Sequence, residues 1–368
     1  MSTDISRRGA LQLTGAVAGG LVLAGAFPAA AGGKQRMYVG SYTGSGGPGV
    51  GVGRIDAATG ALEVDSWLQG PTNPSWVALS PDRRTLWAVS ESVPGGLIAT
   101  FRPGSADRPG PADGVPTGSG PVHLSVHPSG RYLFASMYDG GEIAVHPVGP
   151  DGGVGPATET VRPSTSGQSR IHQTIVDPSE RWLLSADLGR DRVLVHRLDD
   201  NGRLHAAGEA RLPAGAAPRH LAFHPQGRHA YSANEGDSTV TVFRWDNGRL
   251  TAPRSFPTLL GRPAVRNHPG GLAVSPDGRH LYVSNRGDNS IAVFAVEDDG
   301  ARLRLVATPS CGGDWPRHLA IDTSGRWLCV ANQRSDEVVC FALDRETGTP
   351  VREAGRLAVP AVAQVLLA

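Results

Sequence analysis

Two sets of polar residues stand beside apolar segments of this sequence and could together hydrolyse an ester-type carbonyl group. The first set begins such segments and consists of His123, His172, Arg219, His268 and Arg317. The second set follows apolar segments and consists of Glu91, Asp139, Asp187, Glu235, Arg286 and Gln333. Hydrolysis needs a base that activates water, a donor for the carbonyl oxyanion and, for an anionic substrate, cations. The two sets contain all three kinds of group.

Four of these residues are the candidates for catalytic roles. His172 and Glu235 could each act as the base, or Glu235 could orient the His172 imidazole. Arg219 and Arg286 suit an oxyanion or a carboxylate, because a guanidinium presents a planar fork of donors. The candidate substrate-binding residues are Arg317, Arg170, His123, His268, Glu91, Asp187 and Gln333. For each residue taken alone, the alternative is a structural salt bridge at the surface.

Motifs for other chemistries are missing from the sequence. It contains no helical His-x-x-x-His pair, no carboxylate-rich calcium loop and no Gly-x-Ser-x-Gly elbow. The glycine-rich stretch 44–53 lies between two predicted strands, which does not fit a dinucleotide-binding loop. Three cysteines are too few for a four-cysteine zinc site. We therefore expect neither a metal nor an organic cofactor.

The elements that position the two polar sets belong to one repeated unit. Each copy has an apolar strand, a turn, a second apolar strand, a polar tip and a third strand, and copies follow one another every 47–51 residues. The turn positions are Pro81, Pro128, Pro178, Pro225, Pro276 and Thr323. Proline fixes φ at the second turn position, and the glycine that usually follows two residues later tolerates positive φ. This period predicts the blades of an all-β propeller.

A seventh copy is divided between the two ends of the chain. Residues 37–43 match a second strand and residues 49–55 match a third strand, whereas the matching first strand lies at 360–367. The C-terminal strand would then close the ring against the N-terminal blade and remove two exposed sheet edges. We predict one seven-bladed propeller domain over residues 36–368.

A propeller brings the two polar sets together. The inner strands line the centre of the ring, and their starts reach the same mouth as the tips between second and third strands, which makes that mouth the expected site. His127 and His224 end inner strands, so we expect structural roles for them at the opposite face. Trp87, Trp182 and Trp327 begin second strands and are expected to pack between blades.

Several stretches of the repeat resemble one known family. They are YVGSYT (from Tyr38), PRHLAFHP (from Pro218), YSANE (from Tyr231), YVSNRGDNSIAVFAV (from Tyr282) and WPRHLAID (from Trp315). Together they resemble the seven-bladed-propeller lactonases, which include bacterial 6-phosphogluconolactonases and fungal carboxy-muconate cyclases. The resemblance covers residues 36–368 and implies an enzyme that opens a lactone ring.

The resemblance also bears on individual residues. His172 matches the second histidine of the family's Pro-His-x-His motif, and Arg219 and Glu235 fall in matched stretches. Arg170 stands where the family has the first histidine of that motif, and Gly271 stands where it has a glutamate, with His268 just upstream. These two departures imply either an altered substrate or a weakened activity.

Residues 1–31 have the pattern of an export signal. Arg7 and Arg8 precede an uncharged run rich in Ala, Gly, Leu and Val, and Ala29–Ala31 supplies a small-residue cleavage site. The arginine pair resembles a twin-arginine signal, although Ala10 and Gln12 depart from the usual pattern. The alternatives are an ordinary secretory signal or an uncleaved anchor. We expect the twin-arginine export machinery as a partner, an exported bacterial protein, and no membrane association after the signal is removed.

The charge balance and the polar sets together favour one function. Lys and Arg number 35 against 34 Asp and Glu, a net charge of +1, which does not favour a nucleic-acid-binding protein. The leading hypothesis is a monomeric, cofactor-independent hydrolase of a sugar-acid or related lactone. Because the predicted site is rich in cations, we expect the lactone to be anionic. The alternatives are a non-catalytic propeller that binds a ligand or a protein, and a muconolactone-type cycloisomerase.

Two cysteines are predicted to face each other in the last blade. If the hairpin turns at Arg334 and Ser335, Cys329 and Cys340 lie directly opposite one another on neighbouring strands. That separation would allow a disulfide in an oxidising compartment. Both residues lie in apolar strands, where free cysteine is a common core residue, so we favour free thiols.

Overall fold

The computed structural model describes residues 33–102, 114–163, 168–261 and 265–368. The predicted export signal therefore lies outside the described residues. Regular structure is almost entirely β-strand, with three short 3-10 helices: η1 (Thr43–Ser45), η2 (Leu188–Arg190) and η3 (Asp298–Gly300). Within these described ranges, no helix has the length and apolar character needed to cross a membrane.

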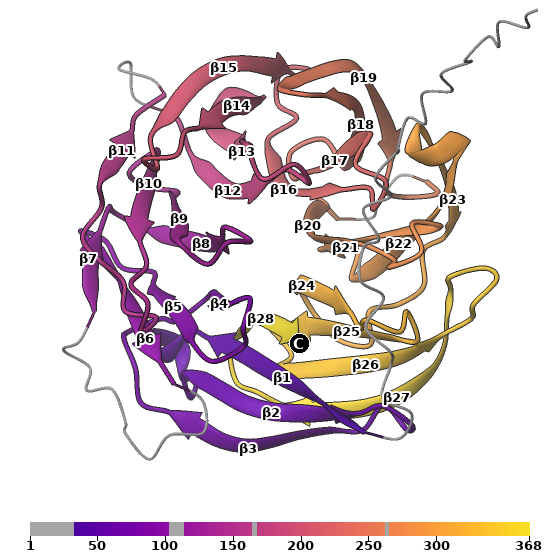
Figure 1. Ribbon diagram of the computed structural model, residues 1–368. Coiled ribbons are helices and arrows are strands. Elements are labelled where there is room, and N and C mark those ends of the chain that lie inside the picture. The colour runs from indigo at the N-terminus through magenta and orange to yellow at the C-terminus, as the bar shows by residue number, and fades with distance from the viewer. Residues whose placement is uncertain (1–32, 103–113, 164–167, 262–264) are drawn as a thin grey trace, which may run out of the picture. The chain divides into compact units, whose positions relative to one another are not determined.

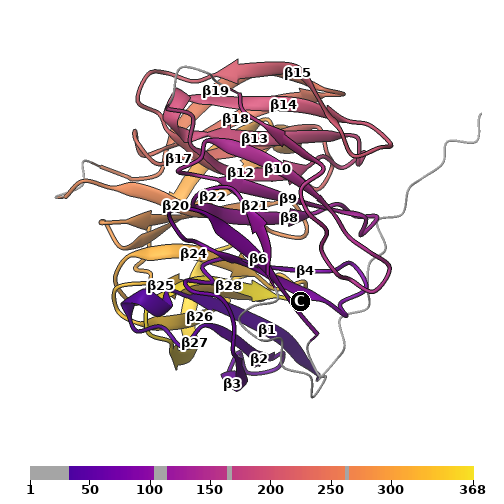
Figure 2. The ribbon, with the colours of Figure 1, turned by 90° about the vertical axis from the view of Figure 1, so that its left-hand side faces the viewer.

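Seven antiparallel, four-stranded sheets form a ring (Figure 1). In each sheet the strands run in chain order from the centre of the ring outward, except in the sheet that joins the two ends of the chain. Figure 2 views the ring from the side, with β12–β15 at the top and β1–β3 at the bottom. The predicted seven-bladed, all-β propeller is confirmed.

The strands are grouped below by blade, from the inner to the outer strand. Blade 1 contains β28 (Val362–Leu367), β1 (Lys34–Ser41), β2 (Val50–Asp56) and β3 (Leu62–Leu68). Blade 2 contains β4 (Val77–Leu79), β5 (Leu86–Ser90), β6 (Gly96–Phe101) and β7 (Val115–Thr117). Blade 3 contains β8 (Pro121–Val126), β9 (Tyr132–Met137), β10 (Glu142–Pro147) and β11 (Glu159–Val161). Blades 4 and 5 contain β12 (Ile171–Val176), β13 (Trp182–Asp187), β14 (Arg192–Leu198) and β15 (Leu204–Arg211); β16 (Pro218–Phe223), β17 (His229–Asn234), β18 (Thr239–Asp246) and β19 (Arg249–Pro257). Blades 6 and 7 contain β20 (His268–Val274), β21 (His280–Arg286), β22 (Ser290–Glu297) and β23 (Arg302–Ala307); β24 (Pro316–Ile321), β25 (Trp327–Asn332), β26 (Glu337–Leu343) and β27 (Pro350–Ala358).

Blade 1 closes the ring with strands from both ends of the chain. The C-terminal β28 pairs antiparallel with β1, with Val39 opposite Val365 and Ser41 opposite Val362. The inner strand of blade 1 thus comes last in the sequence, and the predicted split blade is confirmed. Figure 1 shows this closure where the yellow β28 lies beside the indigo β1.

Neighbouring blades are held together by aromatic side chains that reach an adjacent hairpin turn. The Trp87 and Trp327 indoles donate to the carbonyls of Gly152 and Ala57, at 3.0 and 3.1 Å. Trp182 donates to the Asn247 side chain at 3.2 Å. Each indole thereby packs its apolar surface against the neighbouring blade and also gives its N–H a hydrogen-bond acceptor. The predicted packing role of these tryptophans is confirmed.

The inner strands begin with an irregularity that positions the site. In blades 3, 4, 5 and 7 the pairing register shifts across the second residue of the strand, which is Val122, His172, Arg219 or Arg317. Proline precedes this residue in three of the four strands and has no N–H to donate to the ladder. A bulge of this kind redirects one side chain, and such bulges occur often beside active sites.

The two cysteines of blade 7 have the predicted register. Cys329 on β25 lies directly opposite Cys340 on β26. Both are fully buried in the apolar core between blades 7 and 1, and the structure has them as free thiols. Burial and the neighbouring Cys340 thiol raise the pKa of Cys329.

Candidate active site

Two rings of side chains surround the mouth at which the inner strands begin. We call the residues at the bulge position the mouth ring: Ser75, Val122, His172, Arg219, Gly270, Arg317 and Ala363. The residue that follows each of these in the sequence belongs to a second set, which we call the inner ring: Trp76, His123, Gln173, His220, Gly271, His318 and Gln364. A small pocket lies between the two rings and is lined by Ser75, Trp76, Val122, His172, Arg219, His220, Arg317 and Ala363.

A third group of residues reaches this mouth from the tips between second and third strands. The backbone N–H of the tip residue donates to the carbonyl just before the inner strand, at 2.9 Å for Glu235 and Ala217 and at 3.0 Å for Gln333 and Trp315. Counted from the strands, the tip position is occupied by Tyr42, Glu91, Tyr138, Leu188, Glu235, Arg286 and Gln333. Tip residues from all seven blades therefore converge on one mouth.

Glu235 joins three of the predicted site residues. Its carboxylate lies 2.7 Å from an Arg286 nitrogen, 3.3 Å from Arg219 Nε and 3.9 Å from His268 Nδ1. Burial acts to raise the pKa of Glu235, but the guanidiniums of Arg286 and Arg219 outweigh it and lower that pKa. Glu235 is therefore an ionised carboxylate that neutralises and orients two cations, rather than a strong base.

Arg219 holds a positive charge in a buried position. Arg219 is 2 % exposed, and one guanidinium nitrogen lies 3.1 Å from His220 Nε2. Its Nε is within ion-pair distance of Glu235 but makes no hydrogen bond in the described part of the chain. Burial and the neighbouring Arg286 and Arg317 lower its pKa, which means that the charge is costly here. A bound anion or a developing oxyanion would offset that cost.

A second carboxylate, Glu91, occupies in blade 2 the tip position that Glu235 occupies in blade 5. Arg317 donates to the Tyr42 hydroxyl at 2.5 Å, and that hydroxyl donates to Glu91 at 2.8 Å. The Ser75 hydroxyl also donates to Glu91. Burial, opposed by Arg317 and assisted by Glu91, raises the pKa of Tyr42 to about 12, so the phenol stays protonated. This network fixes the direction of the Arg317 guanidinium.

His172 is a neutral imidazole with an unused ring nitrogen. It is 6 % exposed, and its ring meets those of Tyr138 and His220 edge-on, with centroids 5.9 and 5.2 Å away. Burial, followed by the charges of Arg219 and Arg317, lowers its pKa well below 6.5. Its Nδ1 has no partner among the described residues. The imidazole is therefore neutral at pH 7, the form that a general base must have before it takes a proton.

Three other predicted site residues have different surroundings. His123 belongs to the inner ring, where its Nε2 lies 3.1 Å from the Gln173 amide nitrogen and burial lowers its pKa to about 3. Arg170 lies at the exposed rim, donates to the Tyr138 hydroxyl at 3.0 Å and covers that ring. The tip residue Gln333 contributes the backbone hydrogen bond described above. Its side chain makes no hydrogen bond to a described residue, so the structure gives Gln333 no specific place in the site.

Asp187 is the predicted site residue with the clearest structural role. It is fully buried one position before the tip, and it accepts hydrogen bonds from the Ser169 hydroxyl, the Arg170 N–H and Arg192 at 2.9–3.0 Å. Two of these donors, Ser169 and Arg170, directly precede β12, and the third, Arg192, begins β14. Asp187 therefore shapes the segment that carries Arg170 and His172.

Sequence reasoning missed several residues of the mouth. Tyr42 and Tyr138 occupy the same tip position as Glu235, and His220 and His318 follow the bulge residues Arg219 and Arg317 directly. An alignment of all seven copies, including the divided one, would have shown these positions. The missed inner-ring contacts are between aromatic rings. The centroid of the Trp76 ring lies 4.3, 5.5 and 4.9 Å from the ring centroids of His123, His220 and His318.

The glycine at position 271 has a steric reason in this chain. A Cβ atom there would lie 2.7 Å from the Leu319 nitrogen and 2.9 Å from the His318 Cα, both of them backbone atoms of the next inner strand. The Gly271 N–H also donates to the Ser284 hydroxyl at 2.7 Å. The backbone of blade 6 is thus packed too closely against blade 7 for the glutamate that the family resemblance implies.

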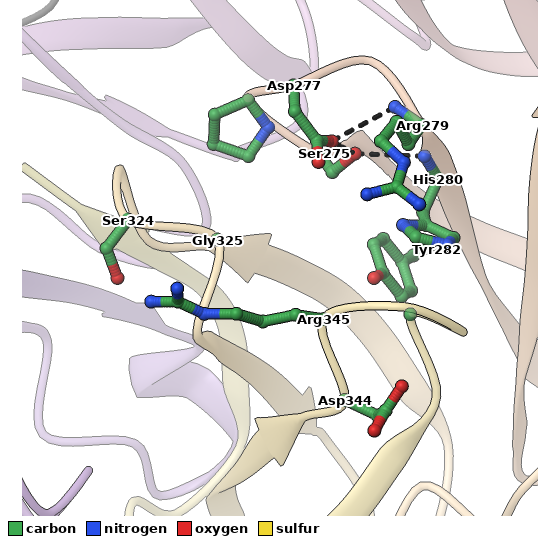
Figure 3. Close-up of a pocket in the computed structure, with 11 residues that line it drawn as sticks. Ser275, Asp277, Arg279, His280, Tyr282, Ser324, Gly325, Asp344 and Arg345 are labelled. Atoms are coloured by element: carbon green, nitrogen blue, oxygen red, sulfur yellow. Dashed lines mark hydrogen bonds between the residues drawn. The ribbon is translucent and has the colours of Figure 1, made fainter.

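A larger pocket of about 270 Å³ opens on turns at the other ends of the inner strands (Figure 3). Its Asp277 carboxylate accepts hydrogen bonds from Ser275 and from the Arg279 N–H, and His280 and Tyr282 form one wall. These turns carry none of the predicted site residues. Across the described ranges, no group of three or more His, Cys, Asp or Glu side chains is arranged to hold a metal ion.

Comparison with known proteins decides the family. The model of the family described as "Lactonase, 7-bladed beta-propeller" matches residues 36–367. The chain belongs to this lactonase family. A 6-phosphogluconolactonase of Bacillus subtilis is 28 % identical over 338 residues, covering 89 % of this chain and 96 % of its own. A 6-phosphogluconolactonase of Pectobacterium carotovorum is 32 % identical over 255 residues, covering 67 % and 74 %.

Two solved structures agree with this fold. A protein from Lactobacillus plantarum superposes with a TM-score of 0.83 at 30 % identity, covering 91 % of this chain and 100 % of its own. A periplasmic gluconolactonase of Pseudomonas aeruginosa superposes with a TM-score of 0.78 at 30 % identity, covering 91 % and 99 %. This lactonase-family chain is therefore similar along its whole propeller to proteins named for lactone hydrolysis.

Proposed function

We propose that this protein opens the ring of a sugar-acid or related lactone by adding water at the mouth of the propeller. The observation that carries the proposal is the neutral, buried His172, which lines the same small pocket as Arg219 and Arg317. A base and two oxyanion donors in one confined place suit acyl transfer to water. The names of the relatives, which are lactonases of sugar acids, support this class of substrate.

The proposed reaction follows from these groups. The His172 imidazole takes a proton from water while the water oxygen bonds to the lactone carbonyl carbon, and the carbonyl electron pair moves onto its oxygen. Arg219 or Arg317 stabilises that oxyanion. The oxyanion then collapses, the ring C–O bond breaks, and the His172 imidazolium returns its proton to the departing alkoxide. Glu235 holds Arg219 and Arg286 in place, and no cofactor takes part.

The charges at the mouth favour an anionic lactone. Arg219, Arg286 and Arg317 face the two carboxylates Glu91 and Glu235, which leaves one positive charge in excess. Unbalanced positive charge in a partly buried site attracts an anionic ligand and raises its association rate. Which lactone fills the site is a question for substrate screening.

We also propose that the protein acts outside the cytoplasm. The support is the signal-like pattern at residues 1–31, together with the 30 % identity to a periplasmic gluconolactonase. Fusing residues 1–31 to a reporter, with and without Arg7→Lys and Arg8→Lys, tests this proposal. Export that depends on both arginines would support the twin-arginine route, and a reporter that stays in the cytoplasm would refute export.

A pH-stat screen tests the proposed activity. Ring opening of a lactone releases one acid equivalent, so alkali uptake reports turnover without a coupled enzyme. The panel contains aldonolactones with and without a phosphate group and a muconolactone, and each is run with and without a chelator. Enzyme-dependent alkali uptake that is insensitive to the chelator is expected for at least one aldonolactone. Tight binding of these compounds without turnover would instead support a binding propeller.

A further inference from the structure

An aromatic residue with unusual backbone geometry lies beside the proposed site. Trp315 precedes β24 and has φ +63°, in the left-handed region that a bulky residue rarely adopts. Its indole contacts the Arg286 guanidinium at 5.6 Å from the ring centroid and lies 6.0 Å from the His268 ring. Trp315 therefore adjoins the end of the site at which Glu235 binds Arg286.

The same backbone position recurs in other blades with smaller residues. Asn73, Gly120, Ala217 and Ala361 each precede an inner strand with φ between +48° and +62°. Each carbonyl accepts the same hydrogen bond from a tip residue that the Trp315 carbonyl accepts from the Gln333 N–H. The fold thus requires the left-handed turn but not the indole, and a strained bulky residue points to a function.

The backbone of Trp315 is held by groups other than its own ring. Its N–H donates to the Asn289 side-chain oxygen at 2.9 Å, and the Asn289 amide donates to Asp314 at 2.7 Å. The turn is therefore fixed from both sides. A smaller residue at position 315 can keep these hydrogen bonds, as Asn73 keeps the matching carbonyl hydrogen bond in blade 2.

The Trp315 indole contacts a second guanidinium, that of Arg334, at the rim of the mouth. The Arg334 guanidinium lies 3.5 Å from the centroid of the Trp315 ring, a close cation–π contact, and Arg334 is exposed. No salt bridge within the described ranges joins it to a carboxylate. Arg286, on the other hand, is paired with Glu235. Arg334 is thus an exposed cation that stacks on the Trp315 ring.

We propose that Trp315 and Arg334 form a rim subsite for an anionic group, a phosphate or a carboxylate, that the lactone carries away from its reacting ring. The stacked guanidinium retains its hydrogen-bond donors for such a group and loses little conformational freedom when it binds. This inference rests on the proposed function for its kinetic test. It adds a specificity site that the predicted residues do not include.

The decisive variant is Arg334→Gln, assayed with paired lactones that differ only in their distal group. The pair is an aldonolactone with and without a 6-phosphate, and a third substrate carries a carboxylate in place of the phosphate. We expect the ratio of kcat/KM for the phosphorylated over the neutral lactone to fall at least tenfold, mainly through KM. A similar fall with the carboxylate substrate identifies a general anion subsite, and a fall with phosphate alone identifies a phosphate subsite.

Trp315→Asn separates a binding role from a structural one. Asparagine tolerates the left-handed backbone, so we expect a melting temperature within about 3 °C of the wild type together with the same loss of anion preference. Ala361→Gly is the matched control, since it relaxes the same backbone position in blade 1 and removes no aromatic ring. An unchanged ratio in Arg334→Gln, or a melting temperature that falls steeply in Trp315→Asn with the ratio unchanged, would overturn the subsite.

A direct binding measurement keeps this test independent of turnover. Titration calorimetry compares 6-phosphogluconate and gluconate, the ring-opened forms, on wild type and Arg334→Gln. If the wild type hydrolyses no lactone but Arg334→Gln weakens 6-phosphogluconate binding at least tenfold, the proposed function fails and the subsite stands. If lactones are hydrolysed and Arg334→Gln affects neither ligand, the subsite fails and the proposed function stands.

Discussion

At the scale of single residues, the site depends on how burial and charge set the protonation of two groups. His172 is kept neutral by burial and by nearby guanidiniums, whereas Glu235 is kept ionised by Arg286 and Arg219. Both pKa values are lowered, so both groups are deprotonated at neutral pH, and what distinguishes them is that the Glu235 carboxylate is already paired with Arg219 and Arg286. We therefore assign the base to His172 and the orienting role to Glu235 as part of the proposed mechanism.

Replacing Glu235 by glutamine should damage both catalysis and stability. The change leaves Arg219 and Arg286 without their shared counter-charge, so we expect kcat to fall about 10²-fold and unfolding to become easier by about 1–2 kcal/mol. Because the pKa of Glu235 is lowered in the folded state, its stabilisation is present above the unfolded pKa of about 4.5 and is lost as the pH falls through the folded value.

Urea unfolding at pH 7 and at low pH, combined with initial rates, measures both effects. Glu63→Gln is the control, because its salt bridges with Lys34 and Arg54 lie on the exposed surface. Wild-type rates and unchanged stability in Glu235→Gln would show that the ion pairs at the mouth are incidental.

At the scale of elements, the inner strands decide which side chains reach the mouth. The bulge at the second residue places His172, Arg219 and Arg317 in one ring and the following residues in another. Blade 6 differs, because its inner strand carries Gly270 and Gly271 and lies against the backbone of blade 7. A substitution in this strand is therefore a test of packing rather than of chemistry.

Gly271→Ala should destabilise the propeller. The added methyl group would meet backbone atoms of His318 and Leu319, which cannot move aside as a side-chain end could. We expect a loss of about 1–3 kcal/mol in the free energy of unfolding. Gly208→Ala is the matched control, since a Cβ on that residue of β15 meets no atom within 4 Å. Equal stability of the two variants would contradict the close approach of blades 6 and 7.

The inner ring should make the protein sensitive to acid. Burial lowers the pKa of His123 and of His318 to about 3, below the ordinary 6.5. The unfolded chain then binds more protons, so the stability present above pH 6.5 is lost as the pH falls from 6.5 toward 3. His123→Gln should weaken this pH dependence, and Gln173 and Gln364 show that glutamine occupies the same ring.

Chemical denaturation at pH 7.5 and pH 5 compares His123→Gln with wild type. The control is His205→Gln, whose imidazole is 59 % exposed at the surface. The difference in unfolding free energy between the two pH values should be smaller in His123→Gln than in either of the others. The same difference in all three proteins would show that His123 titrates normally.

The elements were easier to predict from sequence than the contacts at the site. Proline–glycine turns at a regular spacing identify blades, because each turn type requires those residues. The register of Cys329 opposite Cys340 follows from one hairpin. The Tyr42 bridge between Arg317 and Glu91 joins residues far apart in sequence, and its partners are set by the closed ring rather than by any local pattern.

At the scale of the whole molecule, the ring is closed by eight residues at the C-terminus. β28 contributes the inner strand of blade 1 and carries Ala363 and Gln364 into the mouth and inner rings. The Gln364 side-chain oxygen also accepts a hydrogen bond from the Val77 N–H in the next blade at 2.6 Å, and its amide nitrogen donates to the Val77 carbonyl at 3.1 Å. One strand thus joins blades 1 and 2 as well as the two ends of the domain.

Deleting residues 361–368 should unfold the protein or cause aggregation. The deletion exposes the edge of β1 and removes the partner of Val77, and an unpaired strand edge is a template for association with other chains. Size-exclusion chromatography and thermal unfolding measure the result. The single variant Gln364→Ala, which keeps the strand, should remain folded with a lower melting temperature. A truncated protein that stays monomeric at the wild-type melting temperature would contradict closure by β28.

The central claim is that this mouth hydrolyses a lactone with His172 as the base. The most direct test is the initial rate of alkali uptake by wild type and His172→Ala on the same aldonolactone, above the spontaneous rate and at equal protein concentration. We predict catalysis by the wild type and a fall in kcat of about 10²-fold or more in His172→Ala, with both proteins folded. Equal rates in the two proteins, or no catalysis by the wild type on any lactone of the panel, would contradict the claim.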